Sequence, residues 1–126
     1  MTIDRASQIL VMDDSGAVRS IVRKLLTQLD YIEVDEASDG AAALEKMTEK
    51  LYGLVISDWN MEPVNGKALL EKVRSKKQFE TLPFILMTTA SEQYTILKAR
   101  YVAVSLISKP FTAEDLKSKI SEVSPK

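Results

Sequence analysis

Short apolar runs alternate with segments of helical periodicity, and this alternation constrains the fold more than any other feature. Three runs, Ile9–Met12, Leu54–Ser57 and Phe84–Thr88, are almost continuously apolar. A weaker strand is expected at Ile32–Glu36 and a fifth at Val102–Ile107. Apolar strands separated by amphipathic helices are typical of a parallel sheet that is covered on both faces. The sequence therefore predicts an α/β fold with a doubly wound, five-stranded parallel sheet.

The first expected helix follows Ile9–Met12, and Ser15 is suited to cap it. Its apolar residues recur at i, i+3, i+4 and i+7. They are Val18, Ile21, Val22, Leu25, Leu26 and Leu29. Arg19 and Arg23 fall on the opposite face of this helix, together with Lys24 and Gln28. We therefore expect one apolar face and one basic, polar face.

Later helices are expected after each of the remaining strands. An Ala-rich helix after Asp39-Gly40 should turn Leu44, Met47 and Leu51 inward. The others are a helix carrying Leu69, Leu70 and Val73, a short one near Ser91 to Arg100, and a last one burying Leu116, Ile120 and Val123 behind a capping box of Thr112 and Asp115. A length of 126 residues fits one domain. We expect residues 1–126 to form it, with no output domain.

Composition narrows the chemistry. The chain has no cysteine and no histidine, which excludes disulfides, thiolate or His-ligated metal sites and Ser-His triads. Lys and Arg total 17 and Asp and Glu total 18, so charge gives no reason to expect nucleic acid or an anionic membrane as a partner. No segment approaches the roughly 18–20 apolar residues of a membrane span. With no signal-peptide pattern at the N-terminus, the cytoplasm is the expected location.

Reactive side chains follow four of the five expected strands. Asp13 and Asp14 follow the first strand, and Asp58 follows the third. Thr89 stands at the end of the fourth strand and Lys109 at the end of the fifth. Open parallel sheets form their sites just beyond the carboxyl ends of the strands. If these four strands are neighbours, three carboxylates, a hydroxyl and an amine converge at one edge.

Each of these residues also has an ordinary interpretation, as a helix cap, a turn residue, a strand end or a solvated loop lysine. Together they favour phosphoryl chemistry. Three carboxylates repel one another unless a cation is present, and an all-oxygen ligand set favours Mg²⁺. A lysine beside them suits a phosphoryl oxygen, and aspartate is the plausible covalent acceptor.

The motifs around these residues resemble the receiver domain of two-component response regulators, in particular the stand-alone chemotaxis regulators of the CheY type. The resemblance covers nearly the whole chain. It is carried by Val11–Ser15, Glu36–Gly40, Val55–Met61, Met87–Ala90 and Lys109–Phe111. It implies a flavodoxin-like sheet with strand order 2-1-3-4-5 and helices on both faces.

The resemblance also implies a role for each site residue. Asp58 would be the phosphoacceptor, and Lys109 and Thr89 would contact the phosphoryl group. The metal site would consist of Asp14 bound directly, Asp13 largely through water, Asp58, and the backbone carbonyl of Asn60. Ala90 would leave room for the phosphodonor, and a cis peptide bond would precede Pro110. Trp59, next to the acceptor, is expected to report on metal binding by its fluorescence and to have no catalytic role.

The chain departs from the family pattern at the expected switch. Leu106 stands where many family members carry an aromatic residue on the fifth strand. Tyr94 and Tyr101 are near in sequence but do not align with that position. All three are candidates for the switch and output surface, and we expect Leu106 to contribute mainly to the core.

The implied function is that of a signalling protein that catalyses only its own phosphorylation and dephosphorylation. With Mg²⁺ as cofactor, a CheA-like histidine kinase would phosphorylate it, and a flagellar motor switch protein or a phosphatase would bind it. We expect a monomer. A phosphate sink and a phosphorelay intermediate are the alternatives. A small-molecule phosphotransferase is disfavoured, because Asn60 stands where its second acid/base carboxylate would be. The two aspartates after the first strand argue against a flavin phosphate site.

Overall fold

A computed structural model describes residues 3–59, 66–89 and 103–124. Its five strands form one parallel sheet in the order β2-β1-β3-β4-β5. Their bounds are β1 Ile9–Met12, β2 Val34–Ala37, β3 Leu54–Asp58, β4 Phe84–Thr88 and β5 Val104–Ser108. The sheet confirms the doubly wound, flavodoxin-like fold that the sequence predicts.

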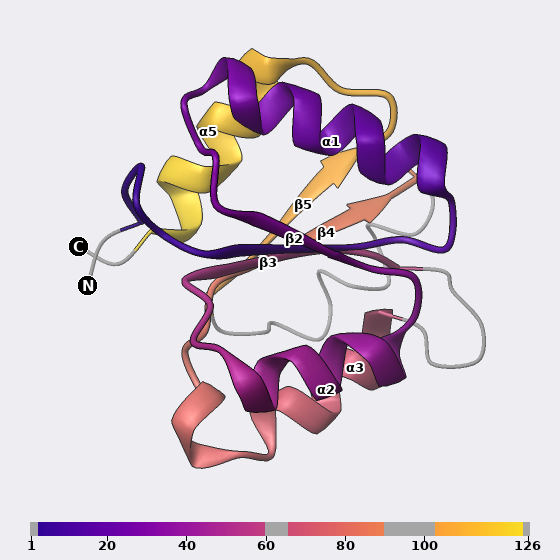
Figure 1. Ribbon diagram of the computed structural model, residues 1–126, viewed down its shortest axis with the longest axis vertical. Coiled ribbons are helices and arrows are strands. Elements are labelled where there is room, and N and C mark those ends of the chain that lie inside the picture. The colour runs from indigo at the N-terminus through magenta and orange to yellow at the C-terminus, as the bar shows by residue number, and fades with distance from the viewer. Residues whose placement is uncertain (1–2, 60–65, 90–102, 125–126) are drawn as a thin grey trace.

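Helices cover both faces of the sheet (Figure 1). On one face lie α1 (Gly16–Gln28) and α5 (Ala113–Val123), and on the other lie α2 (Gly40–Glu49) and α3 (Gly66–Arg74). A single 3₁₀ turn, Lys77–Phe79, follows α3. The helix expected near 91–100 lies outside the described residues. No described helix is long and apolar enough to cross a membrane.

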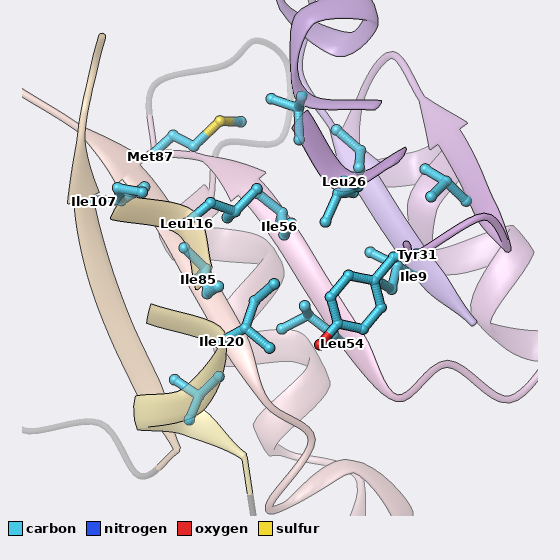
Figure 2. Close-up of a cluster of buried hydrophobic side chains, with 14 residues drawn as sticks. Ile9, Leu26, Tyr31, Leu54, Ile56, Ile85, Met87, Ile107, Leu116 and Ile120 are labelled. Carbon is cyan, nitrogen blue, oxygen red and sulfur yellow. The ribbon is translucent and has the colours of Figure 1, made fainter. Parts of the chain in front are cut away.

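The sheet separates two hydrophobic clusters, because successive side chains of a strand point to opposite faces. Figure 2 shows the cluster beneath α1 and α5, where strand residues such as Ile9 and Ile56 meet Leu26 and Leu116. On the other face, Leu10 and its strand neighbours pack against α2 and α3. Strands buried on both faces form a rigid frame, and the polar residues at their ends are held by that frame.

Side-chain caps begin three of the described helices, and the sequence predicts two of them, at Ser15 and at Thr112 with Asp115. The hydroxyl of Ser15 accepts a hydrogen bond from Val18 N at the start of α1. Asp39 caps α2 in the same way. Thr112 and Asp115 form a reciprocal capping box at the start of α5. Because the Ser15 cap comes two residues after Asp13, it fixes the turn that leads from β1 into α1.

Two residues expected in the core are exposed. Ile21 is 57% exposed, because it lies roughly 140° around the helix from the fully buried Leu26 at 3.6 residues per turn. Leu51 is 83% exposed. The α2 helix ends at Glu49 and the chain becomes extended at Lys50, so Leu51 lies outside the helical register that would have turned it inward.

Two strands begin two residues later than expected. The β2 strand begins at Val34, and Ile32, expected as its first residue, is 69% exposed. The β5 strand begins at Val104. Ala103 has a φ of 56°, a left-handed conformation that is incompatible with an extended strand. The backbone therefore turns just before β5.

Candidate functional site

The carboxyl ends of β1, β3 and β5 bring the expected polar residues together. Asp13 follows the last residue of β1, Asp58 ends β3, and Lys109 follows β5. The parallel register sets Met12 beside Ser57 and sets Asp58 beside Met87. As the sequence predicts, these residues meet at one edge of the sheet, although Asp13 and Lys109 are 96 positions apart in the chain.

Three carboxylates form an acidic cluster at this edge, defined as Asp13, Asp14 and Asp58. One oxygen from each lies within 4.8 Å of the others. Asp13 is 1% exposed and Asp58 is 8% exposed, whereas Asp14 is exposed. Two buried carboxylates and one at the surface make a site that is open to solvent on one side. The all-oxygen donor set and the mutual repulsion both fit a hard cation such as Mg²⁺.

Lys109 bridges the two buried members of the acidic cluster. Its Nζ lies 3.1 Å from Asp58 Oδ1 and 3.4 Å from Asp13 Oδ2. Burial lowers the pKa of the lysine, but the hydrogen bond and charge of Asp58, together with Asp13, outweigh it and raise the pKa overall. The lysine therefore stays charged at neutral pH. The peptide bond between Lys109 and Pro110 is cis, as expected.

Besides Lys109, three further hydrogen bonds hold the backbone and side chain of Asp13. Its N–H donates to Ala37 O over 3.2 Å. Its Oδ1 accepts from Ser15 N over 2.9 Å. Its carbonyl oxygen accepts from Nη1 of Arg19 over 2.6 Å. These bonds fix both the peptide that leads to Asp14 and the carboxylate that faces Lys109.

Helical spacing predicts Arg19 on the polar face of α1 and does not predict that its side chain reaches this site. Its side chain is only 20% exposed and also pairs with Glu36 of β2. A sequence signal did exist: Arg19 and Arg23 are one helical turn apart, and the acidic Glu36 stands in the next strand. Helical spacing places a Cα on a face of the helix, but it does not say where a long side chain ends.

Trp59 directly follows β3 and Thr89 directly follows β4, so both stand at the edge of the sheet that carries the acidic cluster. Trp59 is partly buried against the cluster under α2 and α3, and its N–H donates to Met87 O over 3.0 Å. This position next to Asp58 fits the expected fluorescence reporter. Thr89 is exposed and directly follows β4. The preceding Thr88 is buried, and its hydroxyl has no hydrogen-bond partner within the part of the chain described.

Several sequence predictions lie outside or beside this arrangement. Asn60, Ala90, Tyr94 and Tyr101 lie outside the described residues. Leu106 is partly buried on β5 and packs against the cluster under α2 and α3, so its side chain is not one of the converging polar groups.

A family model described as the response regulator receiver domain matches residues 9–121. The chain belongs to the response regulator receiver family. Among relatives of this receiver domain is a chemotaxis protein CheY homologue from Campylobacter jejuni, 37% identical over 118 residues. That match covers 92% of this chain and 91% of the relative.

Solved structures agree with this assignment. Vibrio cholerae chemotaxis protein CheY4 superposes on the receiver domain with a TM-score of 0.80 at 30% identity, covering 93% of this chain and 98% of that one. The receiver domain of NtrX from Brucella abortus gives a TM-score of 0.82 at 28% identity, covering 92% and 97%. The fold and the family are therefore those that the motifs imply.

Proposed function

We propose that this receiver domain accepts a phosphoryl group on Asp58 from a histidine kinase. The environment of Asp58 carries the proposal. Its carboxylate is buried, lies 3.1 Å from the ammonium of Lys109 and forms a cluster with Asp13 and Asp14. A carboxylate oxygen of Asp58 would form a bond to phosphorus as the phosphorus–nitrogen bond to the kinase histidine breaks. The product would be an acyl phosphate, and the kinase histidine would leave as a neutral imidazole, either with the proton already on its other ring nitrogen or with one taken from water.

The other residues would stabilise charge around that transfer. The acidic cluster and the carbonyl of Asn60 would hold Mg²⁺. When bound, the metal would neutralise charge on the phosphoryl oxygens. Lys109 already lies beside the acceptor, so its ammonium stays close to the negative charge that the phosphoryl group brings. Thr89 would donate a hydrogen bond from its hydroxyl. The residues of this chain would thus position the acceptor carboxylate and neutralise the charge of the phosphoryl group.

The signal would leave the domain by protein contact. A phosphoryl group shifts a two-state equilibrium only if a partner prefers one of the states. Two relatives are named as chemotaxis proteins. We therefore propose a CheA-like kinase as donor and a flagellar motor switch protein or a phosphatase as binding partner, with this chain acting as a cytoplasmic monomer.

The acceptor is tested with a small phosphodonor. Acetyl phosphate and Mg²⁺ should add one phosphoryl group to the wild type and none to Asp58→Asn, as measured by intact mass. Asp30→Asn is a matched control, because Asp30 is exposed, lies outside the acidic cluster and has a left-handed φ of 70° that asparagine tolerates. Phosphorylation of the Asp58→Asn protein, or a label mapped to another residue, would contradict the proposal.

The direction of signalling is tested with a phosphoryl mimic. Beryllofluoride should change which protein this domain retains from a lysate of its own cells. Capture of a motor switch component supports the motor role. Capture of kinases or phosphotransfer proteins alone would favour the alternative of a phosphate sink or a relay intermediate.

A further inference from the structure

We propose that Arg19 is a positioning residue for the acidic cluster. One guanidinium ties the backbone carbonyl of Asp13 to Glu36 on the edge strand, and so keeps the carboxylates of Asp13 and Asp14 directed at Asp58. The inference rests on the proposed function, because the arrangement that Arg19 maintains is the one that would hold Mg²⁺.

The anchor of this contact is Glu36, which is fixed from both sides. Its Oε1 accepts from Arg19 Nε over 3.1 Å, and its Oε2 accepts from Arg23 Nε over 2.8 Å. Burial raises the pKa of Glu36, but the hydrogen bonds from the two arginines together outweigh it and bring the pKa below its ordinary value. The carboxylate stays ionised at neutral pH, and Arg19 is held by a charged partner.

The other end of Arg19 reaches the backbone of the site. Nη1 donates to Asp13 O over 2.6 Å, a short bond from a charged donor. That oxygen belongs to the planar peptide joining Asp13 to Asp14, so holding it fixes the orientation of that plane. The carboxylates on either side of the plane repel each other and Asp58. Without the bond, rotation of the peptide would let Asp14, the exposed member, turn outward.

Arginine suits this task and lysine does not. The guanidinium donates in two directions from different nitrogens, whereas a lysine has one nitrogen at the end of its stem. The positioning contact of Arg19 and its positive charge should also have opposite effects on the affinity for Mg²⁺. A positive charge near the cluster opposes Mg²⁺ binding, so its removal alone should tighten binding. Loss of the positioning contact should weaken binding.

The test compares two arginines that share Glu36 but differ at Asp13. Arg19→Lys, Arg19→Gln, Arg23→Lys and Arg23→Gln would be titrated with Mg²⁺ alone, following Trp59 fluorescence. Metal-free melting temperatures would be measured alongside. Both Arg19 variants should bind Mg²⁺ about tenfold more weakly, the usual loss when a group that orients a metal ligand is removed. Both Arg23 variants should stay within about twofold of wild type, while their melting temperatures fall in the same way as those of the Arg19 variants.

Two results would overturn the inference. If Arg19→Gln binds Mg²⁺ more tightly and Arg19→Lys binds it as wild type does, Arg19 acts only as a charge. If all four variants weaken binding equally, the contact with Glu36 matters and the contact with Asp13 does not. A wild type that shows no Mg²⁺ response would instead contradict the metal site of the proposed function.

Discussion

Replacing Lys109 with methionine should destabilise the metal-free protein and increase its response to Mg²⁺. Methionine keeps much of the length of the side chain and removes its charge. The acidic cluster and Lys109 together carry three negative charges and one positive charge, a sum of −2. The substitution changes that sum to −3, and it leaves the buried Asp13 and Asp58 without their ammonium partner.

The size of the effect follows from the distances. For a unit pair at the 3.1 Å between Lys109 and Asp58, Coulomb's law gives about 5 kcal/mol at an effective dielectric constant of 20 and about 1.3 kcal/mol in water. The lysine side chain is 35% exposed, so solvent screens part of the attraction. We expect a loss of about 2 kcal/mol in the free energy of unfolding. For a domain of this size that corresponds to roughly 6–8 °C in melting temperature.

Thermal unfolding with and without Mg²⁺ measures both parts of this prediction. A ligand that binds the folded state stabilises it by RT ln(1 + [L]/Kd), so a more negative site should gain more from the same Mg²⁺ concentration. Lys119→Met is the matched control, because Lys119 is 33% exposed and pairs at 3.4 Å with an exposed glutamate, Glu122. It should change stability by less than about 0.5 kcal/mol. If Lys109→Met is as stable as this control and gains no more from Mg²⁺, the lysine does not compensate the carboxylates and the reasoning is refuted.

Three further predictions concern single groups. Thr88→Val should raise the free energy of unfolding by about 1 kcal/mol in urea titrations, since it removes a buried hydroxyl that has no partner within the described ranges; an unchanged or lower stability would contradict this. Leu106→Ala should cost about 1–3 kcal/mol, below the full core value because the side chain is only partly buried, and should alter partner binding by the phosphorylated form less than stability. Unchanged stability with lost phosphorylation-dependent binding would instead make Leu106 the switch. Because the folded pKa of Lys109 is raised, its ion pair stabilises fully below the ordinary lysine value of 10.5 and is lost as pH rises through the higher folded pKa. Urea unfolding across that alkaline range should therefore narrow the difference between wild type and Lys109→Met, and a constant difference would count against the pairing.

The sequence predicts the sheet and the acidic cluster well because both follow from strand periodicity. Once Ile9–Met12 and Leu54–Asp58 are parallel neighbours, the residues that end them must meet, whatever the details of side-chain packing. Lys109 follows from the same argument. The fold and the meeting of these charged groups could therefore be predicted from the sequence.

The features that the sequence did not predict depend on how far a side chain reaches, where a helix ends and what surrounds a buried group. Arg19 belongs by its spacing to the polar face, yet its guanidinium reaches back to a backbone carbonyl of the site. Leu51 fits the helical spacing of α2, but the helix ends two residues before it. Among the described residues no group bonds to the hydroxyl of Thr88, and this depends on what surrounds it in three dimensions. The periodicity of apolar residues predicts none of these three features.

The position of Lys109 has a consequence for how the protein acquires its chemistry. Asp13 and Asp14 follow β1 and Asp58 ends β3, and both strands lie inside the sheet, whereas Lys109 follows β5, an edge strand near the end of the chain. Edge elements open more readily than central ones. Each opening of that edge would leave Asp13 and Asp58 without the ammonium group of Lys109. During such local unfolding Lys109 would therefore leave the site while Asp13 and Asp58 stay in place on the interior strands. The rate of hydrogen exchange in β5 and α5 would therefore report how often Lys109 is in place beside Asp58.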